Sequence, residues 1–211
     1  MNTLLAGLFR QCVAALGMVV GLTMLLGLAY PAAVWAISRV NTSGAEGSQI
    51  VDAAGCRMGS ALIGLDPQVG PGAPDPYLHA RVLGAADEPM AAGDPSASAA
   101  SNQGPNSEIL RTNVEARRTL IAAREGVPAA AVPADAVTGS GSGLDPHISP
   151  EYAELQVARL ARENRRSPED IRAVIDAHTE GRQWGFLGQP RVNVLEVNLA
   201  LGHAPPVCGA S

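Results

Sequence analysis

The sequence predicts an α+β protein: a single N-terminal transmembrane helix, then one small extracytoplasmic α/β domain with long loops. Three observations support this fold class. One apolar run lies near the N-terminus, three helix patterns begin at serine caps with only short strand candidates around them, and residues 64–104 are rich in proline and glycine. We therefore expect a cytoplasmic N-terminus over residues 1–10, a membrane helix over residues 11–38 and a soluble domain over residues 42–211.

The apolar run extends from Gln11 to Ser38, with Arg10 before it and Arg39 after it. About 20 residues at 1.5 Å each cross the hydrocarbon of a bilayer, so this run of about 28 can span it even when tilted. A cleaved signal peptide is the alternative, because residues 34–36 weakly imitate a cleavage site; its apolar core would be about twice the usual length. Both interpretations place the rest of the chain outside the cytosol.

Small residues form a strip on the predicted membrane helix. Gly17 and Gly21 make a G-x-x-x-G motif, and Ala14 lies one turn earlier. Such a strip lets a second helix approach closely, although glycine is common in membrane helices and the strip could also face lipid. We name Gly17 and Gly21 as candidate interface residues.

The charge composition excludes several kinds of site. All 15 basic residues are arginine, so the chain has no Walker-A lysine, no Schiff-base lysine and no lysine general base. Only Arg10 and Arg39 precede Asn41, which leaves 13 arginines against 20 acidic residues and a net charge of −7 beyond that point, compared with −5 for the whole chain. We expect no nucleic-acid partner, because phosphate binding needs the opposite field.

The three cysteines follow no metal-binding or disulfide-framework spacing. Cys12 lies in the membrane run, and Cys56 and Cys208 lie far apart in the exported part. A bridge between Cys56 and Cys208 is permitted outside the cytosol, but nothing in the sequence brings them together. Two free thiols are the simpler expectation.

The exported part begins with loops and then becomes helical. Within residues 64–104 we expect one short ordered patch at residues 77–79, and we expect residues 82–98 to be loop without core contacts. Ser107 can cap a helix that runs to Glu125 and is stopped by Gly126. Its expected apolar positions are Ile109, Leu110, Val114, Leu120 and Ile121.

Two further helices begin at Ser-Pro pairs. Ser149, followed by proline, opens a helix through Asn164, and Ser167 repeats the device for a helix that Gly181 ends. Acidic residues in the first turn of the second helix suit the helix dipole. Its apolar face comprises Ile171, Val174, Ile175 and His178, at helical spacing.

Strand candidates are fewer. They are residues 60–63, residues 132–138 around a proline, and residues 192–201. The last run is the best candidate, because Leu195, Val197, Leu199 and Leu201 alternate with a mixed set of residues.

Residues 139–143 form the glycine-rich loop Gly-Ser-Gly-Ser-Gly. No Lys-Ser/Thr pair follows it, and glycine stands where a nucleophile elbow needs serine. We expect a shaped backbone loop and no catalytic residue. A nucleotide or anion cradle at Ser140 and Ser142 is the alternative.

Two histidine motifs offer weak metal or catalytic signals. Asp145 and His147 are two possible metal ligands without a second pair nearby, and Asp before proline is commonly a turn, so we predict no metal site. His178 and Glu180 match half of a deaminase H-x-E motif, but the required P-C-x-x-C is missing. We expect His178 to lie in the last turn of its helix.

Several exact runs together resemble the C subunit of the Kdp potassium-transporting ATPase, a P-type pump. They are residues 59–64, 101–105, 138–149, 178–182, 185–188 and 191–201, and they follow the family's order along nearly the whole chain. The chain departs from the family pattern at residues 81–83, where Arg-Val-Leu replaces Arg-Pro-Ser, and at Gln103, where leucine is usual.

The resemblance implies a non-catalytic subunit held by one helix in the cytoplasmic membrane, with its soluble domain outside. Its partners would be a channel-like potassium-binding subunit, a phosphorylated ATPase subunit and a very small membrane peptide. It would have no cofactor of its own, since ATP and K⁺ belong to the complex. The favoured role is an accessory subunit that stabilises the pump and shapes the outer approach of potassium.

Two other roles stay open. The family has been described as a catalytic chaperone that raises the ATP affinity of the ATPase subunit, and with the family set aside the chain could be an anchored periplasmic hydrolase using Ser140 or Ser142. The polar loops at residues 101–106 and 139–147 suit docking on a partner better than nucleotide binding, because they lack a cationic clamp. We therefore name Asn102, Asp145 and His147 as further candidate interface residues.

Overall fold

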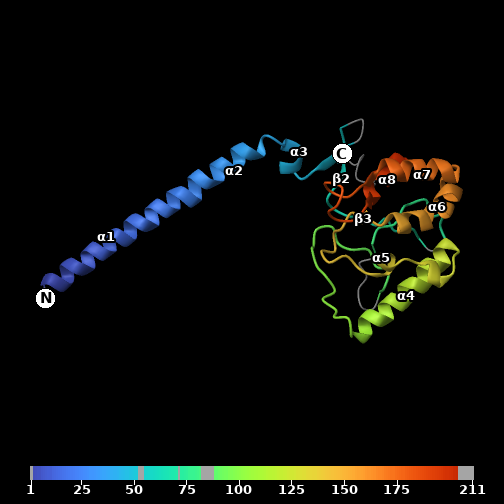
Figure 1. Cartoon of the computed structure of the whole chain (residues 1–211), viewed down its shortest axis with the longest axis horizontal. Coiled ribbons are helices and arrows are strands. Elements are labelled where there is room, and N and C mark those ends of the chain that lie inside the picture. Colours follow the sequence, from blue (N-terminus) through green and yellow to red (C-terminus); the bar gives the residue numbers. More distant parts are fainter. Residues whose placement is uncertain (1, 52–54, 71, 82–87, 204–211) are drawn as a thin grey trace. The chain divides into compact units, whose positions relative to one another are not determined.

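The computed structural model describes residues 2–51, 55–70, 72–81 and 88–203, with side chains from residue 5 onward (Figure 1). The chain divides into two compact units, Met1–Ser48 and Gln49–Ser211. The first is helical and the second combines helices with two small sheets, which agrees with the predicted α+β class.

The first unit is one long apolar helix followed by a short turn of helix. α1 (Asn2–Met24) passes through a π-helical turn, η1 (Leu25–Ala29), into α2 (Tyr30–Ser38). Residues 2–10, for which we expect a cytoplasmic location, belong to the same helix, and four of them are leucine or alanine, which are good helix formers. Within Leu5–Ser38 an 18-residue window has a mean hydropathy of 2.3, and within the described residues this is the one helix long and apolar enough to cross a membrane. α3 (Thr42–Ala45) follows, capped by Asn41.

The π turn has a sequence cause. Pro31, in the first turn of α2, has no backbone N–H to donate, and its ring crowds the carbonyl of the residue four positions earlier. A π turn widens the helix locally and relieves that crowding.

The second unit contains two small antiparallel sheets. β1 (Gln49–Val51) pairs with β2 (Arg57–Ser60), while β5 (Arg191–Asn193) lies between β3 (His147–Ile148) and β4 (Thr179–Glu180). In the second sheet Val192 pairs with Ile148 on one side and with Thr179 on the other.

The three serine-capped helices form as predicted. They are α4 (Glu108–Glu125), α6 (Pro150–Asn164) and α7 (Pro168–Ala177). In each, the cap hydroxyl accepts a bond from the backbone N–H three residues on, and α7 completes a capping box with Asp170. α4 ends at Gly126 in the left-handed conformation, whereas α7 ends before Gly181, because β4 begins at Thr179.

The strand predictions were less accurate. β2 ends at Ser60, so residues 61–63 lie beyond the strand. Residues 132–138 are not a strand but contain α5 (Ala134–Val137), which begins directly after Pro133 and follows η2 (Ala129–Ala131), a 3₁₀ turn. A proline suits a helix start better than a strand interior.

The best strand candidate is mostly helix. β5 ends at Asn193, whose Oδ1 accepts from Glu196 N at 3.2 Å and caps α8 (Val194–Ala200). Val194, Val197 and Leu201 are buried at helical spacing. The alternation that suggested a strand was therefore accidental, since the same run also carries a helical period.

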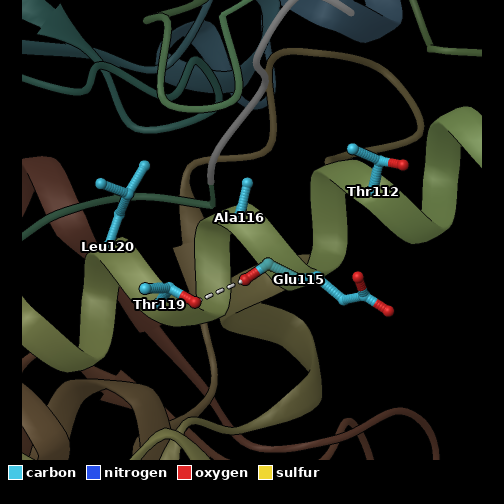
Figure 2. Close-up of a pocket in the computed structure, with 5 residues that line it drawn as sticks. All are labelled: Thr112, Glu115, Ala116, Thr119 and Leu120. Carbon is cyan, nitrogen blue, oxygen red and sulfur yellow. Dashed lines mark hydrogen bonds between the residues drawn. The ribbon is translucent and has the colours of Figure 1, made fainter.

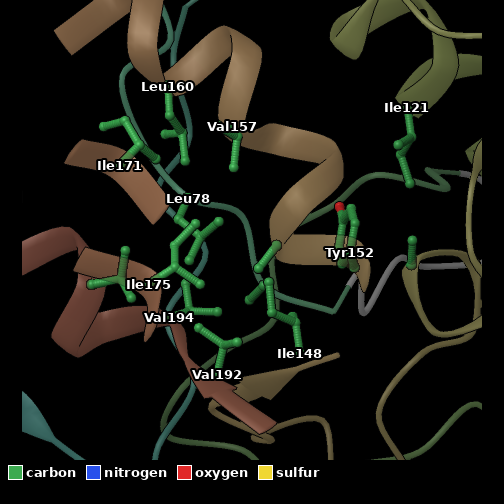
Figure 3. Close-up of a cluster of buried hydrophobic side chains, with 14 of the residues drawn as sticks. Leu78, Ile121, Ile148, Tyr152, Val157, Leu160, Ile171, Ile175, Val192 and Val194 are labelled. Atoms are coloured by element: carbon green, nitrogen blue, oxygen red, sulfur yellow. The ribbon is translucent and has the colours of Figure 1, made fainter. Parts of the chain in front are cut away.

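The core lies between α6, α7, the second sheet and the start of α8 (Figure 3). Tyr152, Leu160 and Ile171 are fully buried, as is Leu78 from the long loop. The ordered patch predicted at residues 77–79 is thus confirmed, although its buried part runs from Leu78 to Ala80. Figure 1 shows α4 packed along another side of this unit.

The long loop has more core contact than its composition suggests. The described part of residues 64–104 forms neither helix nor strand, as expected. However, Met90 packs against the core, and Pro89 O accepts a 2.8 Å bond from Arg117 Nε. The expectation that residues 82–98 lack core contacts was therefore wrong for residues 88–98; residues 82–87 lie outside the described residues.

Candidate functional site

The candidate interface residues lie in both units of the chain. Gly17 and Gly21 are on α1, where an added Cβ would meet no atom within 4 Å. The strip is therefore open on the helix surface. Asp145 and His147 belong to the second unit, where Asp145 ends a loop and His147 begins β3. Asn102 lies in the exposed loop before α4 with a φ of 52°.

The serine-glycine loop is held by its own hydroxyl groups. The Oγ of Ser140 is buried and accepts bonds from the backbone N–H groups of Ser142, Gly143 and Asp145 at 3.2, 3.1 and 3.3 Å. The Oγ of Ser142 accepts from Leu144 N at 3.1 Å. Converging N–H groups are the usual cradle for an anion, but here a serine oxygen already occupies that place.

An arginine ties the two ends of this loop together. Arg81 Nη1 donates to Asp145 Oδ2 at 2.9 Å, and its Nη2 donates to Gly139 O at 3.2 Å. Burial alone would raise the pKa of Asp145, but hydrogen bonds from His147 and Arg81 outweigh it and lower that pKa to about 2. The Asp145 side chain, 30% exposed, is thus ionised at neutral pH and bonded within the loop.

Two other segments pack so closely on the loop that only glycine fits at the points of contact, Gly64 and Gly143. Gly64 N donates to Leu144 O at 2.8 Å, and a Cβ at Gly64 would lie 2.4 Å from Asp145 O. Gly143 has a φ of +73°, and its Cβ would lie 2.5 Å from Ala99 O. We call the resulting surface the loop cluster: residues 64, 98–103 and 139–147.

The side chains of the loop cluster are mostly small or polar. Within the described residues, no group of three or more His, Cys, Asp or Glu side chains could hold a metal ion. His147 Nδ1 lies 3.5 Å from Asp145 Oδ1, with no third ligand beside them. What the cluster offers is a fixed backbone shape with partly exposed polar groups.

The other sequence motifs separate in space. His178 is the C-cap of α7 and lies 3.3 Å from Glu196 through its Nδ1, whereas Glu180 pairs with Arg191. His178 and Glu180, the two matched residues of the deaminase-like H-x-E motif, therefore bond different partners.

The cysteines differ from the simpler expectation. Cys12 is free, but Cys56 is disulfide-bonded, so the expectation of a free thiol at Cys56 was wrong. Cys208 lies outside the described residues. Its distance from Cys56 along the chain explains why the sequence could not decide the matter.

The sequence reading missed a buried ionic network at the base of the long loop. The His79 ring lies between two carboxylates, with Nδ1 2.9 Å from Asp66 Oδ1 and Nε2 2.8 Å from Asp75 Oδ2. Both ring nitrogens of His79 therefore face a carboxylate oxygen. Burial opposes the ionised form of Asp75, but the hydrogen bond and charge of His79, with Arg159, lower its pKa.

Arg159 is the centre of this network. Its Nε donates to both oxygens of Glu125 at 3.2 and 3.0 Å, and its Nη1 donates to the carbonyls of Asp75 and Tyr77 at 2.7 and 2.9 Å. Its Nη2 donates to Gln156 Oε1 at 2.9 Å. The Glu125 side chain is 0% exposed and that of Arg159 is 3% exposed. The arginine therefore joins the long loop to α4 and α6.

Arg124 completes the network. It donates to Glu125 at 2.7 Å and to the hydroxyl of Tyr152 at 3.0 Å, and burial raises the pKa of that hydroxyl. The network thus joins three basic side chains, His79, Arg124 and Arg159, to the carboxylates of Asp66, Asp75 and Glu125.

One signal in the sequence indicated that α4 has a polar buried face. Asn113, Arg117 and Ile121 follow one another at intervals of four residues and are buried, as is Glu125, whereas the predicted apolar residues Ile109 and Leu120 are 49% and 48% exposed. Of the predicted apolar residues, Val114 and Ile121 do pack in the core, but polar side chains share that face. Arg117 donates there to the carbonyls of Pro89 and Val137, and Glu125 pairs with Arg159.

A shallow hollow lies on the opposite side of α4 (Figure 2). Its lining residues all come from this one helix: Thr112, Glu115, Ala116, Thr119 and Leu120. Thr119 Oγ1 donates to the carbonyl of Glu115 at 3.0 Å, within the same helix. The hollow brings no converging groups together and gives no reason to place a ligand there.

The sequence matches one known family over most of its length. The family described as "K+-transporting ATPase, c chain" matches residues 12–203. A potassium-transporting ATPase KdpC subunit of Kineococcus radiotolerans is 46% identical over 209 residues, which cover 98% of this chain and 100% of that protein. The KdpC subunit of Koribacter versatilis is 40% identical over 201 residues, which cover 94% of this chain and 97% of that protein.

Proposed function

Because this chain belongs to the KdpC family, the C subunits of potassium-transporting ATPases, we propose that it is a non-catalytic accessory subunit of an ATP-driven potassium-uptake complex. In this proposal the N-terminal helix anchors the chain in the cytoplasmic membrane, and the soluble domain lies outside. The domain stabilises assembly of a channel-like potassium-binding subunit, a P-type ATPase subunit and a small membrane peptide, and it shapes the outer approach of K⁺.

The observation that carries the proposal is the internal bonding of the loop cluster. Ser140 and the Arg81–Asp145 pair fix the backbone of residues 139–147 without any ligand. A surface that is ordered before binding loses little entropy when it docks. Such a surface is suited to holding a partner protein in one position.

The same bonding argues against ATP binding by this loop. A phosphate would need the N–H groups of Ser142, Gly143 and Asp145, and Ser140 Oγ already accepts all three. No lysine is available to balance a triphosphate. We therefore place ATP binding on the ATPase subunit and favour the accessory role over the catalytic-chaperone role.

Assembly of the whole complex tests the accessory role. Asp145→Ala combined with His147→Ala should lower the yield of co-purified partner subunits or raise the K⁺ concentration needed for half-maximal ATPase activity. Asp94→Ala is the control, because among the described residues this exposed carboxylate bonds only Ser96. Unchanged yield and K⁺ dependence in the double variant, with the variant chain present, would contradict docking through the loop cluster.

ATP binding is tested on the full chain in detergent by calorimetry. We expect affinity no better than about millimolar, near the weak end of specific binding. Micromolar binding by the chain alone would overturn the accessory role and restore the chaperone role.

A further inference from the structure

A short hairpin between β4 and β5 carries the most exposed aromatic side chains of the described second unit. Gln183 and Leu187 exchange two backbone bonds, each with an N···O distance of 2.9 Å. Trp184 and Gly185 reverse the chain with φ values of 52° and 81°. The hairpin is therefore tight, and its tip holds a defined shape.

Large apolar side chains gather at this tip. Trp184 is 85% exposed, Phe186 is 67% exposed and Leu187 is 43% exposed. The rings of Trp184 and Phe186 lie side by side, with centroids 6.5 Å apart. Positive φ normally selects glycine or asparagine, so tryptophan is an unfavourable residue for this turn. Its exposed ring is also unfavourable in water.

The charge around the tip differs from that of the exported part as a whole. Residues 181–190 contain no acidic residue and one basic residue, Arg182, which donates to Gln189 at 2.9 Å. Beyond Asn41 the chain as a whole has a net charge of −7. The tip is thus a locally cationic, apolar point that complements an anionic surface.

The end of the apolar helix already carries the same pair of residue types. The guanidinium of Arg39 lies 5.7 Å from the centroid of the Trp35 ring, at the end of α2. Tryptophan with arginine is the usual composition of a chain where it passes through lipid headgroups. Ten residues join Ser38 to β1 and can extend at most about 35 Å, a length that permits the second unit to reach the bilayer.

We infer that the tip formed by Trp184, Phe186 and Leu187 is a second membrane anchor, which inserts into the headgroup region of the bilayer that holds the apolar helix. Arg182 would lie beside the lipid phosphates. Three side chains cover less than the roughly 800 Å² per partner of a specific protein interface. Binding to lipid needs a smaller contact area, because the apolar helix already tethers the chain to the bilayer. Lipid is therefore the occupant that fits the size and charge of the patch.

Tryptophan fluorescence of the full chain in nanodiscs tests the inference. Trp35→Phe leaves Trp184 as the only tryptophan. With lipids brominated along the acyl chains, emission from Trp184 should be strongly quenched, and in unbrominated lipid it should be blue-shifted. Arg182→Gln should weaken both effects in anionic lipid and leave them unchanged in zwitterionic lipid.

A matched variant reports from another exposed position of the same unit. Trp35→Phe, Trp184→Asn and Leu120→Trp together move the single tryptophan to α4, while asparagine keeps the positive φ of the turn. Its emission should not respond to bromine. Equal quenching at both positions, or no quenching at Trp184, would overturn the inference. Shielding of Trp184 from a soluble quencher only in the assembled complex would also overturn it, because the tip would then bind protein.

Discussion

Arg159 should be sensitive to substitution, because its side chain is 3% exposed and bonds Glu125, Gln156 and two loop carbonyls. In Arg159→Leu, Glu125 keeps only its bond to Arg124, and the carbonyls of Asp75 and Tyr77 lose the guanidinium. Breaking a buried ion pair from one side costs about 3–5 kcal/mol, and each partly buried carbonyl left unpaired adds up to about 1–3 kcal/mol. The total approaches the stability of a whole domain, about 5–15 kcal/mol.

Pulse proteolysis in urea measures this loss on the full chain in detergent. The control is Arg172→Leu, which breaks a similar two-pronged pair with Glu154 whose side chains are 46% and 55% exposed. An exposed pair contributes at most about 1 kcal/mol. We expect Arg159→Leu to be largely unfolded without denaturant and Arg172→Leu to resemble the parent. Similar midpoints for the two variants would refute the reasoning from burial.

Three further predictions concern the loop cluster and the membrane helix. Because its pKa is lowered to about 2, ionised Asp145 stabilises the fold above about pH 4, and this stabilisation is lost as the pH falls toward 2. Asp145→Asn should remove up to about 2 kcal/mol of this acid dependence, measured from unfolding midpoints across that pH range. Gly64→Ala should lower the free energy of unfolding in urea by several kcal/mol, because the added Cβ would meet backbone atoms. Gly141→Ala, where nothing lies within 4 Å of the added Cβ, should cost less than about 1 kcal/mol, and equal costs would contradict the packing. If Gly17 and Gly21 contact a partner helix, replacing both with leucine should remove the subunit from the purified complex although it still inserts, and full co-purification would place that face toward lipid.

Local chemistry could be read from the sequence with good accuracy. The caps at Ser107, Ser149 and Ser167 depend on hydrogen bonds that span three residues, so the printed order of residues contains all the information needed. The run from Val192 to Leu201 failed because two periods fit it. Asn193 followed by Glu196 is a helix-capping pattern that indicates a helix, and in so short a segment it is stronger evidence than alternating hydrophobicity.

The buried network and the loop cluster depend on contacts between distant residues. Arg159 meets Asp75 across 84 positions, and Gly64 meets Leu144 across 80. No local pattern encodes such a pairing, and composition marked residues 64–104 only as loop. The serine-glycine loop lies between these cases: its glycines indicated a shaped backbone, but only the structure shows that Ser140 fills the cradle.

The π turn at Leu25–Ala29 changes which residues of the apolar helix lie on the same face. One extra residue in a turn rotates everything after it by about 100° relative to an unbroken helix. On an unbroken helical wheel, the face of Gly17 and Gly21 would continue through Leu28, Ala32 and Trp35. With the rotation it continues instead through Ala29, Ala33 and Ala36, all small residues. A neighbouring helix could therefore stay close along nearly the whole length of the anchor, and Trp35 would turn away from it.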